Sequence, residues 1–272
     1  MKPATHFLMP LLLASACAFA APTQAAKKDE GALADAVVQR LESSGALDKA
    51  VDRAIDRRIR QDAEARQKAA EEAQKKRMEM VANLRKVDPA RDHVYGPVEA
   101  KYSILVYSDL ECPFCKRFAG VAEGLADKSP QVNVVWRHFP LEMHGANALK
   151  ESYAAECVAK QAGHGGFFKF VDAVFRDGQT NGQGLPGGDT ALGQLAKQAG
   201  AGDEKSFNRC LADAETAKVI GEDIKDGIGG GIEGTPGVVL RDNASGRSLL
   251  VGGAIPPAAL EARLNAFLAE KP

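Results

Sequence analysis

Aromatic residues, cysteine and a surplus of charge of either sign are all scarce in this sequence of 272 residues. Lysine and arginine together number 35 against 36 for aspartate and glutamate, so the net charge of -1 gives no reason to expect binding to nucleic acid or to an anionic membrane. No segment after residue 20 is apolar for long enough to span a bilayer, which predicts a soluble mature protein. The glycine-rich stretch 227–236 lacks the Gly-Lys-Ser/Thr of a phosphate-binding loop, and it does not directly follow a strand pattern, so no nucleotide loop is expected.

The first 20 residues have the pattern of an export signal. One lysine precedes the apolar stretch 7–19, and Ala18-Phe19-Ala20 has the small residues of a cleavage site. An alternative makes Cys17 a lipidation site, but Ala14 stands where such signals prefer Leu. We therefore expect a signal peptide over 1–20, cleavage near Ala20 and a mature protein in the periplasm.

Residues 27–88 contain no aromatic residue and carry charges of alternating sign, which is typical of a solvated helix. The pattern predicts two helices, 29–44 and 47–87, with Gly45 as the stop between them. Larger apolar residues recur on one face of each helix. They are Leu33, Val37 and Leu41 on the first helix, and Leu47, Val51, Ile55 and Ile59 on the second.

A lone helix cannot bury this apolar stripe against itself. We therefore predict a helical stalk over 27–88 that forms a coiled-coil homo-oligomer through about residues 29–60. The alternative is a disordered or monomeric helical arm. Apolar positions are sparse after Ile59, so the later part would act as a spacer. The pattern does not separate a dimer from a trimer.

The remaining residues, 89–272, are numerous enough for one substantial core. After a linker over 91–100, the patterns predict an α/β domain in the order βαβ, a helical insertion, and ββα, which is the arrangement of the thioredoxin fold. The expected strands are 102–107, 132–137, 238–240 and 249–251. The expected helices are 113–126 and 257–268, and the insertion covers about 143–228, broken by a loop at 177–189.

Cys112-Pro113-Phe114-Cys115 follows the first of these strands and opens the first helix of the domain. A helix N-terminus stabilises a thiolate, Pro113 fits the first helical turn, and Cys115 lies three residues after Cys112 on the same face. The pair is therefore interpreted as a redox site in which Cys112 is the exposed attacking thiol and Cys115 the buried resolving thiol. The alternatives are a structural disulfide, half of a zinc site that lacks a second ligand pair, and copper binding.

Cys157 and Cys210 lie in separate helices of the predicted insertion. Export to an oxidising compartment favours a structural disulfide between them, and free buried thiols are the main alternative. Neither has a cysteine near it in sequence, so a catalytic role is not expected.

From about Tyr95 to its end, the chain resembles the DsbA family of exported thiol-disulfide oxidoreductases, in the form that has a four-helix insertion. Several motifs in the right order carry the resemblance. They are Asp109-Leu110-Glu111-Cys112-Pro113-Phe114-Cys115, Arg137-His138-Phe139-Pro140-Leu141, Gly165-Gly166-Phe167-Phe168-Lys169-Phe170, Gly234-Thr235-Pro236 and Gly252-Gly253.

The resemblance implies that Cys112 is the nucleophile, that Cys115 resolves the mixed disulfide, and that Pro236 is a cis-proline opposite them. Thr235 would offer backbone groups to an extended client segment, and Pro113 and Phe114 would line the same site. It also implies misfolded or unfolded exported proteins as clients and a membrane redox partner of DsbB or DsbD type. Neither a cofactor nor a metal is expected.

The direction of electron flow is left open by the resemblance. The best-known oxidase of the family has His where this chain has Phe114, and Phe114 cannot supply the same charge to a thiolate. Glu111 beside Cys112 would also oppose the thiolate if its carboxylate pointed inward. Both features favour a less oxidising disulfide.

The stalk is similar in plan to ScsC-type proteins and, by analogy, to DsbC and DsbG, in which a dimerisation region holds catalytic domains apart. This similarity favours an oligomeric disulfide isomerase or reductase. Two alternatives stay open: a dithiol oxidase whose stalk is only a tether, and a copper-binding or chaperone module that uses the same cysteines.

Overall fold

The computed structural model describes residues 24–270, so the expected signal peptide over 1–20 lies outside the described residues. Contacts divide the chain after Lys68 into two units, which are described separately. Within residues 24–270, no helix is apolar over enough of its length to cross a membrane.

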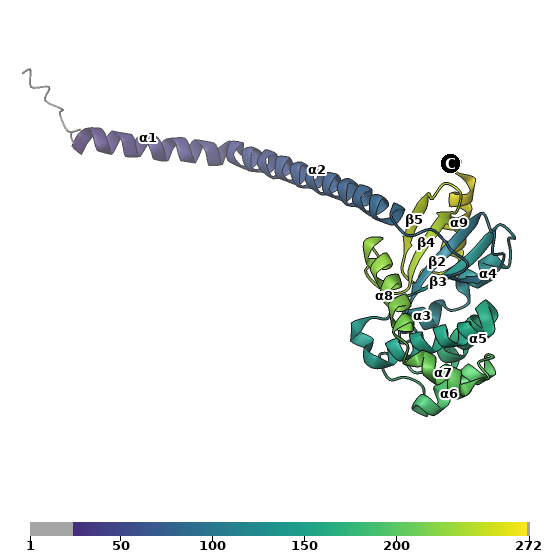
Figure 1. The fold of residues 1–272 in the computed structure, drawn as a ribbon. Coiled ribbons are helices and arrows are strands. Elements are labelled where there is room, and N and C mark those ends of the chain that lie inside the picture. The colour runs from purple at the N-terminus through teal and green to yellow at the C-terminus, as the bar shows by residue number, and fades with distance from the viewer. Residues whose placement is uncertain (1–23, 271–272) are drawn as a thin grey trace, which may run out of the picture. The chain divides into compact units, whose positions relative to one another are not determined.

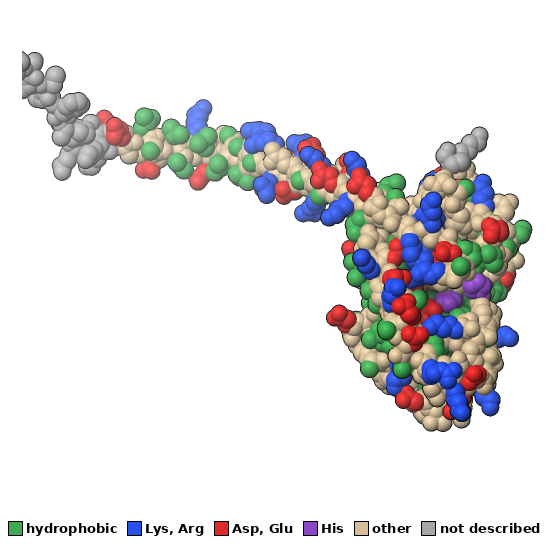
Figure 2. Space-filling view, viewed as in Figure 1, with side chains coloured by type: hydrophobic (Ala, Val, Ile, Leu, Met, Phe, Trp, Pro, Cys, Tyr) green, Lys and Arg blue, Asp and Glu red, His purple; other side chains and the backbone are tan. Residues whose placement is uncertain are grey.

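The first unit is helical. It contains α1, Gln24–Ser43, and the beginning of α2, Ala46–Ala82, and the two helices are separated at Gly45, which has a φ of 63°. Hydrophobic side chains gather along α1 and the first part of α2, and charged side chains dominate further along α2 (Figure 2). The two helices and their separator agree with the sequence pattern.

The second helix ends earlier than expected, at Ala82 instead of residue 87. The backbone N–H of Arg85 donates to Asp226 Oδ1 at 2.8 Å, and the side chain of Leu84 is buried beside Gly230. These contacts with the end of α8, Ala214–Gly229, hold residues 84 and 85 in place and divert the chain from the helical path.

The second unit is built on a five-stranded sheet in the order β1-β3-β2-β4-β5 (Figure 1). Strands β2 and β3 are parallel and every other neighbouring pair is antiparallel. The strands are β1, His93–Tyr95; β2, Tyr102–Ser108; β3, Val132–His138; β4, Gly237–Asp242; and β5, Ser248–Gly252. The expected thioredoxin arrangement is therefore present.

Two expectations about this unit were wrong. The linker over 91–100 contains β1, which pairs with β3 but is only three residues long, too short to show an alternating pattern. The single helix expected over 113–126 is two helices, α3, Pro113–Phe118, and α4, Val121–Ala126. Gly120 between them has a φ of 76°, a left-handed conformation that glycine adopts without strain and that interrupts the helix.

The insertion between β3 and β4 contains four α-helices, preceded by the short 3₁₀ helix η1, Glu142–His144. Helices α5, α6 and α7 form a group of their own beside the sheet (Figure 1). The four helices are α5, Gly145–Asp177; α6, Gly188–Gln198; α7, Glu204–Leu211; and α8, Ala214–Gly229. The last helix of the chain is α9, Pro257–Ala269.

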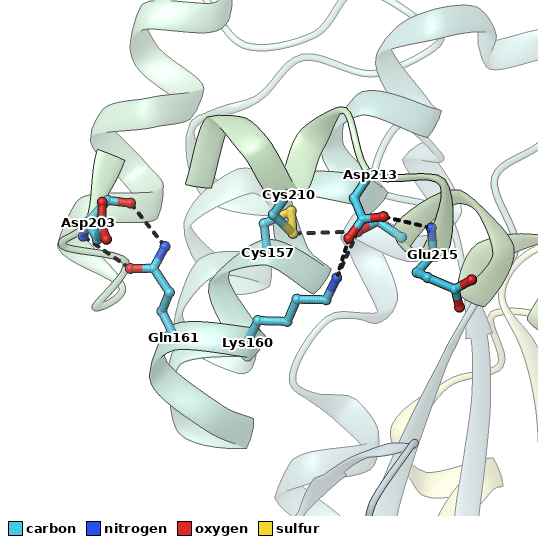
Figure 3. The surroundings of a disulfide bond; sticks show 8 residues. Cys157, Lys160, Gln161, Asp203, Cys210, Asp213 and Glu215 are labelled. Atoms are coloured by element: carbon cyan, nitrogen blue, oxygen red, sulfur yellow. Dashed lines mark hydrogen bonds and ion pairs between the residues drawn. A yellow bond between two sulfur atoms is a disulfide. The ribbon is translucent and has the colours of Figure 1, made fainter. Parts of the chain in front are cut away.

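Cys157 of α5 and Cys210 of α7 form a disulfide, with an S–S distance of 2.05 Å. The amide of Gln161 exchanges two hydrogen bonds with the backbone of Asp203 on one side of it (Figure 3). On the other side the ammonium of Lys160 lies 3.8 Å from the Asp213 carboxylate. These contacts fasten α7 to α5, and the disulfide agrees with the pairing expected from the sequence.

The two faces of the sheet bury different clusters because successive side chains of a strand alternate. On β2, Ile104 and Val106 pack with α4 and α9, whereas Leu105 and Tyr107 pack with Val81 at the end of α2. The final turn of α2 is thus part of the core of the second unit.

Arg137 on β3 is fully buried and connects the sheet to the segment that follows α2. Its guanidinium donates to Asp92, to Asp226 and to the Tyr107 hydroxyl, and also to the backbone carbonyls of Arg85 and Lys86. A buried ion pair of this kind is costly to break on one side, because the remaining charges stay buried without a partner.

We expect Arg137→Met to lower the free energy of unfolding by about 3–5 kcal/mol, because Asp92 and Asp226 lose their fully buried counter-charge and keep only the partly exposed Arg85. Urea denaturation followed by circular dichroism measures this. Arg176→Met is the matched control, since Arg176 pairs with Asp177 at the surface and its loss should leave the free energy of unfolding nearly unchanged. Equal effects of the two substitutions would contradict the role given to Arg137.

Candidate active site

The two cysteines of the Cys-x-x-Cys motif lie where β2 ends and α3 begins. Cys112 is the N-cap residue of α3, with extended φ and ψ of -81° and 122°, and Pro113 is the first helical residue. The free N–H groups and the positive dipole end of α3 therefore lie beside the Cys112 sulfur. Cys115, one turn further on, is also a free thiol.

Both cysteines are buried, with 2 % of each residue exposed, so the expectation that Cys112 is exposed was wrong. The reason is the loop before β4, in which the Thr235–Pro236 peptide bond is cis. When Cys112 is a thiol, its Sγ donates a hydrogen bond to the Thr235 carbonyl oxygen at 3.4 Å. The loop thus lies over the sulfur, where the resemblance placed it, and Pro236 lies next to the site.

The electrostatic surroundings separate the two thiols. A hydrogen bond from the Cys115 thiol, helped by Thr235 and by the N–H groups of Cys115 and Phe114, lowers the pKa of Cys112 to about 5 despite its burial. Burial first, and then the charge and hydrogen bond of Cys112, raise the pKa of Cys115 far above that of an ordinary thiol. Cys112 is therefore the thiolate near neutral pH, and Cys115 keeps its proton.

Glu111, directly before Cys112, does not direct its carboxylate at the sulfur. Its two carboxylate oxygens accept hydrogen bonds from the backbone N–H groups of Gly182 and Gly184, both at 2.7 Å. These glycines have φ values of 83° and 73°. A Cβ on Gly182 would lie 2.8 Å from the His144 carbonyl oxygen, so the loop needs glycine there. The expectation that Glu111 could oppose the thiolate therefore does not apply in this conformation.

Two further buried carboxyl groups support this segment. Asp109 accepts hydrogen bonds from the backbone N–H groups of Glu111 and Leu141 and bonds to the ring of His144. Burial, together with the charge of Glu111, raises the pKa of Glu151 to about 9, so Glu151 is protonated at neutral pH. Because it is protonated, Glu151 does not place a second negative charge beside Glu111.

A groove of about 490 Å³ lies next to the cysteines. Phe114, Thr235 and Pro236 line it, and 52 % of Phe114 is exposed. Arg77 near the end of α2 also lines the groove. Residues 69–82 of α2 thus contribute to the site. Sequence reasoning missed Arg77, because it is one of many charged residues in a stretch with the pattern of a solvated helix.

A second group of side chains could be mistaken for a metal site. His93 Nε2 and His138 Nε2 lie 2.7 Å and 3.2 Å from Glu156 Oε1, and all three residues are buried. However, Trp136 Nε1 lies 3.4 Å from His138 Nδ1, and an indole N–H can only donate. His138 Nδ1 is then an acceptor and Nε2 carries the proton, at 3.2 Å from Glu156 Oε1. The group fits a carboxylate bonded by two imidazoles better than a metal site.

Comparison with known proteins places these features in a family context. Residues 88–249 match the family model described as Thioredoxin. DsbA2 of Pseudomonas aeruginosa is similar with 36% sequence identity and a TM-score of 0.57, over 65% of this chain and 94% of that one. A linker-deletion variant of Proteus mirabilis ScsC is similar with 22% identity and a TM-score of 0.57, over 92% of this chain and 99% of that one. At this lower identity the likeness shows the fold alone.

The Na(+)/H(+) antiporter NhaA 1 of Mycolicibacterium gilvum is also similar, with 40% identity over 93 residues. The matched part is 34% of this chain, and it is only 15% of the length of that relative. The similarity therefore concerns one part of the antiporter chain and carries no statement about ion transport.

We expect the reduced protein to gain thiolate absorbance at 240 nm with a midpoint near pH 5, and Cys112→Ser to lose this transition. Because the folded pKa is below the ordinary value of 9.0, the thiolate stabilises the reduced form fully above about pH 9. That contribution shrinks as the pH falls and is gone once the pH has fallen through about 5. A midpoint at the ordinary thiol pKa would contradict the electrostatic account.

Proposed function

The chain belongs to the thioredoxin family, as a DsbA-like thiol-disulfide oxidoreductase, and from this premise we propose that it is an exported, oligomeric disulfide isomerase or reductase. The observation that supports the chemistry is a buried dithiol at a helix N-terminus, covered by a cis-proline loop. Its Cys112 thiolate attacks a client disulfide, and Cys115 resolves the mixed disulfide. The clients we propose are exported proteins with wrong disulfides.

Oligomerisation is proposed from the apolar stripe of the first unit. Its side chains are about half exposed or more in the single chain, which is unusual for so many large apolar residues in a row. The exposed fractions are Leu33 67%, Val37 50%, Leu41 43%, Leu47 49%, Val51 48%, Ile55 50% and Ile59 60%. A second copy of the same stripe would cover them and would bring two active sites to one client.

We expect the mature protein to sediment as an oligomer, and the double substitution Val51→Asp with Ile55→Asp to give a monomer, because two charges would enter the apolar interface. Arg53→Asp is the matched control, since it places the same residue on the opposite face of α2 and should leave the oligomer intact. Sedimentation equilibrium measures both. A wild-type monomer would contradict the proposed interface.

The direction of the reaction is tested with a scrambled multi-disulfide enzyme and pre-reduced protein at catalytic concentration. We expect the wild type and Arg53→Asp to restore the enzyme's activity. The monomeric Val51→Asp, Ile55→Asp variant should lose most of that activity while it still exchanges a single disulfide at the wild-type rate.

Unchanged isomerisation by the monomer would contradict the role of the stalk. If the wild type restores no activity, and its Cys112–Cys115 disulfide rapidly oxidises a reduced client, the protein is an oxidase and the stalk a tether. A membrane partner of DsbD type would keep an isomerase reduced, whereas a partner of DsbB type would reoxidise an oxidase.

A further inference from the structure

Arg77 is the side chain that α2 contributes to the groove beside the dithiol, and the packing of the last turns of α2 determines its position. Val81 is buried in the same cluster as Ile232, which also lines the groove. Arg77 lies four residues before Val81 and therefore on the same face of the helix, one turn nearer its N-terminus. Its side chain thus extends into the groove from a turn that borders the core.

The loop that leads from α8 towards β4 packs closely on the same turns of α2. A Cβ on Gly230 would overlap the side chain of Leu84. The side chain of Met80 lies against Gly231. The guanidinium of Arg241 on β4 donates to the Leu84 carbonyl oxygen at 3.2 Å. The end of α2 is therefore held in place beside the groove, and Arg77 with it.

The groove combines exposed backbone with two charged side chains. Five of the residues that line it are glycines, which leave backbone groups open to an extended chain. The two charged residues in the described part of the lining are Arg77 and Glu233, and both are exposed. No ion pair joins them, and Arg77 has no hydrogen bond to any residue within 24–270. Its guanidinium is therefore available to a charged group of a client.

Two other cations near the dithiol already have partners. The ammonium of Lys116 donates to the Gly178 carbonyl oxygen at 2.7 Å. The guanidinium of Arg117 lies 4.5 Å from the centre of the Phe114 ring, the distance of a cation–π contact. Neither cation lines the groove. Arg77 is thus the cation best placed to pair with a client that lies there.

A cation in the groove matters because the attacking group is an anion. Cys112 is a thiolate near neutral pH, so a client carboxylate close to the attacked disulfide would be repelled by it. A guanidinium pairs with a carboxylate through two parallel hydrogen bonds. Such a pair at Arg77 would offset the repulsion and add to the affinity for the client.

We propose that Arg77 selects client segments that carry an acidic residue close to the attacked cysteine, by pairing with that residue while the segment lies in the groove. This inference rests on the thiol-disulfide exchange proposed above. In the selected step the Cys112 thiolate bonds to one sulfur of the client disulfide, the client S–S bond breaks, and the other client sulfur leaves as a thiolate. Arg77 forms no bond to these sulfurs and acts as a specificity-determining residue.

The test uses short peptides whose single cysteine is joined by a disulfide to 5-thio-2-nitrobenzoate. Cys112 attacks the peptide sulfur, because the nitrobenzoate thiolate has the lower pKa and leaves faster, and its release is followed by visible absorbance. One peptide residue is varied as Glu, Gln or Lys, two positions before the cysteine in one series and two positions after it in another. Stopped flow with reduced protein in excess gives the rate of attack on each peptide.

In one of the two series we expect the wild type to attack the Glu peptide about threefold faster than the Gln peptide, and the Lys peptide more slowly than either. Salt at about 0.5 M should largely remove this preference. Arg77→Gln should abolish it, and Arg77→Glu should reverse it in favour of the Lys peptide. The ratio between peptides is the decisive quantity, because a changed Cys112 pKa would alter the rates of all peptides alike.

Lys76→Gln is the matched control, because it removes the same charge from the neighbouring position of α2 but does not line the groove. It should keep the preference, and so should Arg117→Gln. A preference that is absent from both series, that survives Arg77→Gln, or that is lost equally in Lys76→Gln would overturn the role of Arg77. Failure of the wild type to release nitrobenzoate thiolate from any peptide would instead overturn the proposed thiol-disulfide exchange.

Discussion

The buried guanidinium of Arg137 is the interaction on which the rest of the second unit depends. It lies on β3 and satisfies Asp92 before β1, Asp226 of α8 and carbonyl groups just after α2. The segment after α2, strand β3 and helix α8 are distant in sequence and therefore meet at one charge. Because the Arg137 charge is fully buried, none of these segments can move away without removing a hydrogen-bond partner from an ion in the core. The end of α2, the insertion and the sheet are fixed to one another in this way, and the active site lies between them.

The active site keeps the negative charges of nearby carboxylates away from the Cys112 sulfur. The segment before Cys112 is rich in acids, and a carboxylate next to the sulfur would oppose its ionisation. In the fold, the Glu111 carboxylate accepts hydrogen bonds from backbone N–H groups of the loop at 178–184 and so does not face the sulfur. Glu151 stays protonated and adds no negative charge. The helix N-terminus and the Cys115 thiol are then left to stabilise the Cys112 thiolate. A structural loop of the insertion thereby influences the chemistry of the dithiol.

The sequence predicted the fold class from local patterns, and the Cys-x-x-Cys motif predicted two thiols at the start of a helix. The Cys157–Cys210 disulfide was predicted from the oxidising compartment to which the chain was expected to be exported. Sequence reasoning missed β1, which is too short to show the alternating pattern of a strand. It also missed the break at Gly120, where a single glycine decides between one helix and two. The sequence left open where the Glu111 carboxylate points, since only the tertiary structure shows which N–H groups a carboxylate reaches. Arg77 could not be assigned at all, because it is an ordinary helix-surface residue until the groove exists.

The depth of Cys115 bears on the direction of the reaction. After Cys112 has attacked a client, two events compete: resolution by Cys115, which releases a reduced client, and attack by another client thiol, which reshuffles its disulfides. An isomerase needs the mixed disulfide to last long enough for the second event. A resolving thiol that is buried, and whose pKa is held far above the ordinary value, slows the first event without preventing it. The burial that stabilises the core would therefore also set how long a client stays attached. A second active site on a neighbouring copy could attack another disulfide of the same client during that time.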